Sequence, residues 1–456
     1  MQPRHTAQVL IAGGGLVGSL LAVMLRRRGL QVTVLERRPD MRKVPIPAGR
    51  SINLALSDRG IRALKAAGVF EQVAPLLLPM YRRTMHDRQG RLSYQPYGRP
   101  DQCINSVGRG TLNKILLNQA EKAGAQIYFN CRVTGLDPAQ KVIFTETGET
   151  FHYEKLLACD GAFSAIRLYL ITTDRFNYSQ SYLEHGYCEI HMPPNPDGSW
   201  RLAHDTLHIW PRKSFMLIAL PNPDGSFTCT LFLPFEGDIS FQKISTLQEA
   251  EQFVKTWFPD IIPHISDYAQ QFATNIRSSL MTVRCSPWNL GEDILLLGDA
   301  AHAIVPFYGQ GMNAGFEDVR LLCEWADKQG GFFTKGLFPR FAQFRQPDGH
   351  AIADLALKNF VEMRDLTADP AFLLRKQIEA WFSEKYPHLW IPQYTLVTFS
   401  HVPYRVALEA GRIQDEIMER VLRETADIAT GSWDHARAEA LMLEGSKRLP
   451  AADLVV

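Results

Sequence analysis

The sequence predicts an α/β protein: a Rossmann-like dinucleotide-binding domain, an inserted antiparallel sheet and a carboxyl-terminal helical region. Three observations support this prediction. Gly13, Gly15 and Gly18 follow an apolar strand and open a helix, as in a dinucleotide site. Two later apolar strands end in Asp160-Gly161 and Gly298-Asp299, and short β-prone runs lie between them. Helical periodicity dominates the end of the chain, in stretches such as "RIQDEIMERVLRETADIA".

The composition is that of an ordinary enzyme, with 456 residues, 46% of them hydrophobic and 21% charged. A net charge of +1 gives no electrostatic support to a nucleic-acid partner. The seven cysteines contain no C-x-x-C, which argues against a disulfide framework or a zinc site and favours a reducing compartment. We see no signal peptide and no apolar run long enough to span a bilayer, so we expect a soluble, cytoplasmic protein. The oligomeric state cannot be predicted.

The amino-terminal glycines have the context of a nucleotide site. Gly13 suits the tight turn, Gly15 lets the backbone approach a pyrophosphate, and Gly18 lets the helix pack on the strand. A second strand, "QVTVLE", ends in Glu36, which can accept hydrogen bonds from ribose hydroxyls. Because Glu36 disfavours a 2′-phosphate, FAD or NAD fits this position better than NADP. A tight turn without a ligand is the alternative.

The two later strands predict the rest of the site, because polar residues at the carboxyl ends of parallel strands face the ligand crevice. Asp299 is therefore placed to bind a ribityl or ribose hydroxyl. The glycine-rich segment at 309–313 opens a helix whose free N–H groups can stabilise negative charge on a ring cofactor. We interpret His302 as a packing and hydrogen-bonding residue, because no serine or cysteine nucleophile motif accompanies it. A catalytic His302 is the alternative.

Together, the G-x-G-x-x-G, Asp-Gly and Gly-Asp motifs resemble the class A flavoprotein aromatic hydroxylases, the group related to p-hydroxybenzoate hydroxylase. The resemblance implies FAD in the Rossmann-like domain and chemistry carried by the flavin, with no certain catalytic side chain. It also places an arginine, Arg109, near the flavin, for which a solvated arginine at a helix start is the alternative. The cofactor-binding residues implied are Gly13, Gly15, Leu16, Val17, Gly18, Glu36, Arg37, Arg38, Ala55, Arg109, Asp160, Asp299, Gly311, Met312 and Asn313.

Longer strings narrow the resemblance to the kynurenine 3-monooxygenase family. They include "GRSINLALSDRG" (49–60), "LHIWPR" (207–212), "RQPDGHAIADLALKNFVEM" (345–363) and "IPQYTLVTFSHVPY" (391–404). This similarity runs along nearly the whole chain and thins after about residue 410. It implies hydroxylation of L-kynurenine to 3-hydroxy-L-kynurenine with NADPH and O2, through a flavin C4a-hydroperoxide. Eukaryotic relatives carry a carboxyl-terminal membrane anchor, and we expect none here.

Kynurenine is an α-amino acid with a 2-aminophenyl ketone, so its site needs a cation and an apolar slot. By resemblance, Arg83 and Tyr97 bind the carboxylate, and Asn359, Tyr394 and Glu362 complete the polar end. The residues implied to line the ring slot are Phe232, Leu207, Met216, Pro306, Phe307, Met363 and Thr398. Three alternatives stay open. The first is that Arg82 takes this role in place of Arg83, the second that Phe232 and Met216 are ordinary core residues, and the third that Glu362 is a solvated helix residue.

We place the FAD-binding domain at 1–74, 98–174 and 276–345, the substrate sheet at 75–97 and 175–275, and the helical region at 346–456. Tyr308 stands where relatives often have Phe or His. The other candidate functions are hydroxylation of another aromatic amine or amino acid and non-catalytic flavin binding by a regulator. A flavin-dependent halogenase is disfavoured, because its Trp-x-Trp-x-Ile-Pro motif is absent.

Overall fold

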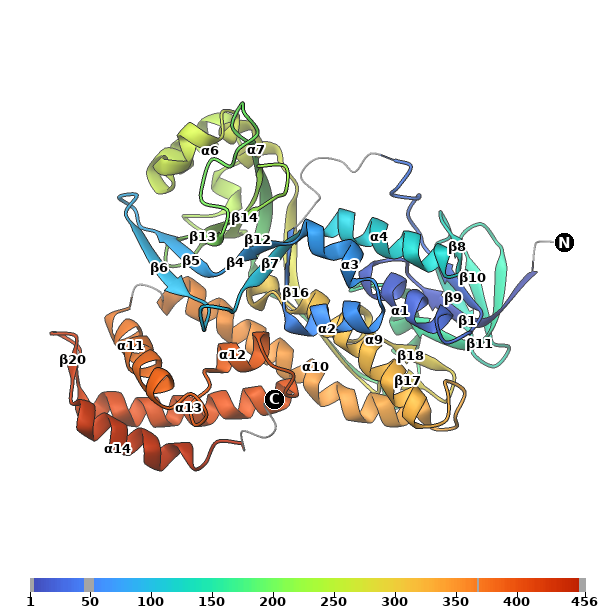
Figure 1. The fold of residues 1–456 in the computed structure, drawn as a ribbon. Coiled ribbons are helices and arrows are strands. Elements are labelled where there is room, and N and C mark those ends of the chain that lie inside the picture. Colours follow the sequence, from blue (N-terminus) through green and yellow to red (C-terminus); the bar gives the residue numbers. More distant parts are fainter. Residues whose placement is uncertain (1–3, 45–52, 367–368, 451–456) are drawn as a thin grey trace.

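A mainly parallel sheet forms the centre of the dinucleotide-binding part of the chain (Figure 1). The computed structural model describes residues 4–44, 53–366 and 369–450. Within them, the strand order of this sheet is β17-β18-β11-β1-β2-β8, and β10 joins β11 to β9. The strands are β1 (Arg4–Ala12), β2 (Val32–Leu35), β8 (Gln126–Tyr128), β9 (Val133–Asp137), β10 (Val142–Thr145), β11 (Thr150–Ala158), β17 (Asn289–Leu290) and β18 (Ile294–Leu296). Strands β18, β11, β1, β2 and β8 are parallel, as a Rossmann-like sheet requires.

Helix α1 (Leu16–Arg26) forms directly after the glycine turn and buries its apolar side, including Leu20, Leu21 and Met24. It packs against α4 (Arg109–Lys122) and α9 (Gly311–Lys328), so residues far apart in sequence meet at one crevice. The other helical segments here are α2 (Asp58–Ala66), α3 (Phe70–Val73), η1 (Ala74–Leu76), α5 (Ala165–Leu170), α8 (Asp299–His302) and η4 (Pro306–Tyr308). A small antiparallel sheet of β3 (Asn53–Leu56), β7 (Ile104–Gly108) and β4 (Leu78–Met80) lies beside them.

A second, seven-stranded sheet has the order β16-β12-β15-β14-β13-β5-β6. Its strands are β5 (Arg82–His86), β6 (Leu92–Pro96), β12 (Asn177–Met192), β13 (Thr206–Pro211), β14 (Met216–Pro221), β15 (Phe227–Pro234) and β16 (Arg277–Ser286). All neighbours are antiparallel except β13 and β5, which pair in parallel with Leu207 opposite Arg83. One face packs on η2 (Phe241–Lys243), α6 (Leu247–Trp257), η3 (Pro259–His264) and α7 (Tyr268–Thr274) in an apolar cluster. The other face therefore remains for a ligand.

The carboxyl-terminal helices cover one side of that ligand face (Figure 1). They are α10 (Leu337–Val361), α11 (Pro370–Lys385), α12 (Gln393–Thr398), α13 (Tyr404–Thr425) and α14 (His435–Ser446), with a short β19–β20 pair (Ala426–Asp427 and Ser432–Trp433). The sequence "RIQDEIMERVLRETADIA" falls mainly in α13, as its periodicity predicts. Helix α10 continues into a π-helical segment, Glu362–Leu366, which changes the angular spacing of the side chains there.

The structure confirms the predicted α/β fold with an inserted, largely antiparallel sheet and carboxyl-terminal helices. The domain boundaries stay a prediction. Strand β16 lies in the second sheet, within the range 276–345 that we assigned to the FAD-binding domain. The first four residues of the predicted string at 49–60 lie outside the described residues. In the described ranges, no helix combines the length and hydrophobicity needed to cross a bilayer.

A buried histidine behind the second sheet makes stability depend on pH. His208 Nε2 contacts Ala203 O at 2.8 Å, and its Nδ1 contacts His86 Nε2 at 2.8 Å. Burial lowers the pKa of His208 to about 4. The unfolded chain therefore binds this proton first, so the stability is complete above about pH 6.5 and is lost as pH falls toward 4. The loss attributable to this residue is about 3 kcal/mol.

Urea unfolding at pH 7 and pH 4.5 measures this loss. We expect His208→Gln to be less stable than the parent at pH 7 but to show a smaller drop between the two pH values. The exposed His388 is the matched control, and His388→Gln should retain the full drop. An equal drop in the parent and in His208→Gln would contradict the assignment.

Candidate cofactor and substrate site

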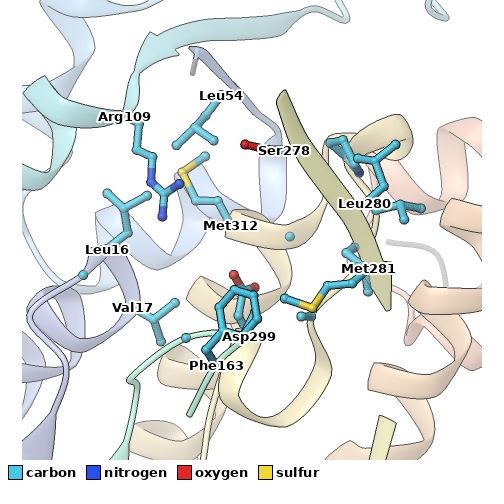
Figure 2. Close-up of a pocket in the computed structure, with 18 of the residues that line it drawn as sticks. Leu16, Val17, Leu54, Arg109, Phe163, Ser278, Leu280, Met281, Asp299 and Met312 are labelled. Carbon is cyan, nitrogen blue, oxygen red and sulfur yellow. The ribbon is translucent and has the colours of Figure 1, made fainter. Parts of the chain in front are cut away.

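One cavity of about 1110 Å³ joins the glycine turn to the ligand face of the second sheet (Figure 2). This volume exceeds the range of roughly 300–1,000 Å³ that is typical for one small ligand, so two ligands can share it. The predicted cofactor residues that line it are Gly13, Gly15, Leu16, Val17, Glu36, Arg37, Arg38, Ala55, Arg109, Asp160, Asp299, Gly311 and Met312. The predicted substrate residues that line it are Arg83, Tyr97, Leu207, Phe232, Pro306, Phe307, Met363 and Tyr394.

The three glycines of the turn have different structural roles. Gly13 has φ +99°, and a Cβ there would lie 2.4 Å from Cys159 O. A Cβ on Gly18 would lie 2.0 Å from Gly13 O, so Gly18 allows close packing and does not line the cavity. A Cβ on Gly15 would meet nothing within 4 Å, although Gly15 lines the cavity. The space beside Gly15 is therefore open to a ligand, as pyrophosphate binding requires.

Glu36 directly follows β2, and its carboxylate binds the backbone of the glycine turn. Its Oε2 accepts a hydrogen bond from Gly14 N at 2.9 Å, and its Oε1 accepts from Arg38 N and Nε at 2.9 and 2.8 Å. The side chain is buried yet lines the cavity. Arg38 Nη2 also donates to Oε2, at 3.3 Å, so all of the roughly four lone-pair positions of this carboxylate are used. A ligand hydroxyl would therefore bind Glu36 by displacing the half-exposed side chain of Arg38.

Asp160 gives the sharpest test of whether a cofactor fits. Its Oδ2 accepts from Ala165 N at 2.7 Å, whereas its Oδ1 is buried and has no hydrogen-bond partner among the described residues. Burial raises the pKa of this carboxyl. An unpartnered buried oxygen on the wall of a cavity costs free energy unless a ligand donates to it. Hydroxyl groups on the sugar or ribityl part of FAD are donors of this kind, so the residues present fit FAD.

Asp299 and the glycine-rich loop form the opposite wall. Gly298 has φ +58°, and Asp299 follows it at the start of α8, facing the cavity. Asn313 does not line the cavity. Its amide Nδ2 donates to Ala55 O and Gly309 O at 2.8 Å each, so it holds the loop that presents Gly311 and Met312.

Arg109 begins α4 and extends into the cavity toward Leu16 and Met312 (Figure 2). In the described chain, no acidic side chain lies within ion-pair distance of it. An unpaired cation at a helix start beside a dinucleotide turn attracts a negatively charged ligand.

At the polar end of the substrate region, the cation of Arg83 lies beside two aromatic rings. The guanidinium of Arg83 lies 5.0 Å from the ring centre of Tyr97 and 4.6 Å from that of Tyr394. These two rings are nearly parallel, at 11°, and their centres are 5.8 Å apart. Burial raises the pKa of Tyr97, so its hydroxyl keeps its proton. With no acidic partner for Arg83 among the described residues, the arrangement suits a ligand carboxylate.

The remaining walls of this region are apolar. Phe232 and Phe307 face each other with ring centres 4.8 Å apart. The residues that line the cavity but were not assigned to it from the sequence include Ile218, Leu220 and Tyr308. Of these, only Tyr308 stood out in the sequence, as a departure from relatives. The period-two alternation of β14 places Ile218 and Leu220 on one face with Met216 and could have identified them. Tyr308 stacks on Tyr394 with ring centres 5.3 Å apart.

Four predicted substrate residues do not line the large cavity. Asn359 and Glu362 line a second cavity of about 50 Å³ behind Tyr308 and Tyr394, and Asn359 Nδ2 donates to Phe307 O at 2.7 Å. Glu362 therefore faces the small cavity, whereas its neighbour Met363 faces the large one. Met216 is fully buried beside Phe232, and Thr398 is fully buried on α12. The roles of these four residues in substrate binding therefore stay predictions. Each would have to act through a residue that lines the large cavity, or its side chain would have to move into that cavity.

Comparison with known proteins gives concordant results. Residues 6–326 match the model of the FAD binding domain family. A kynurenine 3-monooxygenase of Flavobacterium psychrophilum is 46% identical over 92% of this chain and 94% of its own length. The enzyme of that name from Sus scrofa is 42% identical over 91% of this chain and 88% of its own.

Solved structures with the same fold are more distant in sequence. The tetrameric form of 2-methyl-3-hydroxypyridine-5-carboxylic acid oxygenase has a TM-score of 0.66 at 20% identity, covering 81% of this chain and 95% of its own. PqsL of P. aeruginosa, solved with 2-aminobenzoylacetate, has a TM-score of 0.65 at 18% identity, covering 79% and 97%. At these identities the likeness shows the fold alone.

Proposed function

This chain belongs to the kynurenine 3-monooxygenase family of FAD-binding proteins, and from that premise we propose that it hydroxylates L-kynurenine at ring position 3, consuming NADPH and O2. The observation that carries the proposal is that one cavity contains both the dinucleotide turn and a half-buried arginine beside two tyrosines. A cofactor and an aromatic amino acid bound there would have their reactive rings in contact.

FAD bound in this cavity would accept two electrons from NADPH and activate O2 for transfer of one oxygen atom to the substrate. The residues assigned to hold it are Gly15 at the pyrophosphate, Glu36 and Asp160 at hydroxyl groups, and Asp299 at the ribityl chain. Arg109 and the amino terminus of α9 place positive potential beside the ring system. This potential stabilises negative charge that develops during reduction.

Arg83 would bind the substrate carboxylate, with the hydroxyl of Tyr97 as an additional donor. The aromatic ring would then occupy the apolar space between Phe232 and Phe307. These walls exclude water from the reacting carbon, which protects the activated oxygen from unproductive release. The aniline nitrogen already donates electrons to the ring, so the protein needs to orient the ring rather than supply a strong base. Asn359 supports this orientation by fixing the carbonyl of Phe307.

Aerobic NADPH consumption by the FAD-loaded protein, with and without L-kynurenine, tests the proposal when it is coupled to mass analysis of the product. We expect strong stimulation and a product heavier by one oxygen atom. Anaerobic stopped-flow should also show faster flavin reduction when L-kynurenine is bound, because unproductive reduction would waste NADPH.

Stimulated NADPH use that yields only H2O2 would contradict L-kynurenine as the substrate and favour another aromatic amine. Bound flavin with no stimulation would contradict the monooxygenase assignment itself and favour a flavin-binding regulator. The first outcome would contradict only the substrate assignment, whereas the second would contradict the reaction class.

A further inference from the structure

A fully buried carboxylate lies directly behind the turn that presents Asp299. Asp318 of α9 has no exposed surface. Its Oδ2 accepts from Gly298 N at 3.0 Å and from His302 Nε2 at 2.6 Å. Its Oδ1 accepts from Arg345 Nε at 2.8 Å. One carboxylate thus joins the Gly298 turn, helix α8 and helix α10.

The same carboxylate is the end of a buried ionic network that reaches the carboxyl-terminal helices. Arg345 also lies 2.8 Å from Glu317, and Glu317 lies 2.8 Å from Arg59. Arg59 donates to Val397 O at 2.9 Å and to Val402 O at 2.6 Å, which flank the end of α12. The end of α12 is therefore linked to Asp318 through two arginines.

A second route returns from these helices to the glycine-rich loop. Arg59 stacks on the ring of Tyr404 at 4.1 Å. The Tyr404 hydroxyl donates to Gln310 Oε1 at 3.0 Å, and Gln310 immediately precedes Gly311 at the start of α9. The two routes end at Gly298 and at Gln310, and the residue that follows each of them, Asp299 or Gly311, lines the cavity.

The geometry at Gly298 shows why the turn needs support. Gly298 has φ +58° and ψ −140°, and a Cβ there would lie 3.0 Å from Val17, which lines the cavity. Asp318 binds the N–H of this residue, and His302 ties the other end of the four-residue helix α8 to the same oxygen. Burial raises the pKa of Asp318, but the charges of His302 and Arg345 lower it by more, so the net shift is downward and the carboxylate stays ionised. Buried ion pairs are weak evidence for stability, but they do fix geometry.

We propose that Asp318 is a positioning residue for the cofactor: it sets the Gly298–Asp299 turn so that Asp299 meets the ribityl chain, and Arg345 makes this setting depend on docking of the carboxyl-terminal helices. His302 acts with Asp318 as a positioning residue through its Nε2–H. The inference rests on the proposed FAD site but not on the identity of the substrate.

Asp318→Asn tests the inference, because one of its two terminal atoms becomes a donor and cannot accept from Arg345 or from Gly298 and His302. We expect the dissociation constant of FAD, titrated into the apoprotein, to rise about tenfold, as for loss of a charge-assisted hydrogen bond. The visible flavin spectrum and the midpoint potential should shift as well. Asp354→Asn is the matched control, because Asp354 lies on α10 in an exposed ion pair with Arg284 at 2.6 Å.

Two further variants keep the test decisive if Asp318→Asn does not fold. Gln has a donor nitrogen as many bonds from Cα as His Nε2, so His302→Gln should retain FAD affinity and spectrum, whereas His302→Leu should lose affinity about tenfold. Lower thermal stability in Asp318→Asn and His302→Leu with unchanged FAD affinity, spectrum and potential would overturn the inference. If the unaltered protein bound no FAD, the proposed function would fail instead.

Discussion

Replacing Arg83 by alanine is expected to raise the KM for L-kynurenine roughly 100-fold, with a much smaller change in kcat. Arg83 lies beside the rings of Tyr97 and Tyr394, where the chain offers a half-buried cation with no acidic partner among the described residues. Its removal leaves the substrate carboxylate without a counter-charge in a largely apolar cavity. Steady-state NADPH oxidation and a titration that follows the flavin absorbance measure the two quantities separately.

The adjacent arginine is the control. Arg82 points to the opposite face of β5, where it pairs with Asp205 at 3.1 Å and lies over Tyr94. Arg82→Ala should therefore leave the KM nearly unchanged, since exposed ion pairs contribute little. If Arg82→Ala weakened substrate binding and Arg83→Ala did not, the assignment of the carboxylate site would be wrong.

Gly15→Ala is expected to weaken FAD binding roughly 100-fold while leaving the folding of the apoprotein intact. The added methyl group meets no atom of the protein within 4 Å but enters the space assigned to the pyrophosphate. Fluorescence titration of the apoprotein with FAD gives the affinity, and thermal unfolding of the apoprotein gives the stability. We expect the FAD affinity to fall while the thermal stability of the apoprotein stays unchanged.

Gly18→Ala should behave in the opposite way. Its methyl group would lie 2.0 Å from Gly13 O, so it should destabilise the apoprotein itself. Gly108→Ala is the neutral control, since its nearest neighbour would be Thr111 Oγ1 at 3.6 Å. Tight FAD binding by Gly15→Ala would contradict the placement of the pyrophosphate.

The parts of the fold that local sequence determines were predicted well. The glycine spacing, the apolar strand before it and Glu36 after it specify a β–α–β unit within about thirty residues, and the structure contains it. The parallel pairing of β13 with β5 could not be predicted, because it joins Leu207 to Arg83 through contacts that leave no local pattern. The pairing of β16 with β12 in the second sheet joins distant segments in the same way.

In the candidate site, too, local motifs predicted some positions, whereas tertiary packing determines others. Residues fixed by a motif, such as Asp160 and Asp299, line the cavity as expected. Glu362, which the resemblance assigns to the polar end of the substrate site, lines the small second cavity, at the start of the π-helical segment. A departure from 3.6 residues per turn depends on packing at the end of α10, and the periodicity of the sequence does not encode it.

The order of strands in the central sheet has a consequence for biosynthesis. Strand β1 at residues 4–12 lies beside β11 at 150–158, and β11 lies beside β18 at 294–296. A nascent chain therefore keeps an unpaired strand edge and an incomplete crevice until roughly two-thirds of it has left the ribosome. Cofactor loading must follow that point, because Asp299, which lines the cavity, is made only after β18.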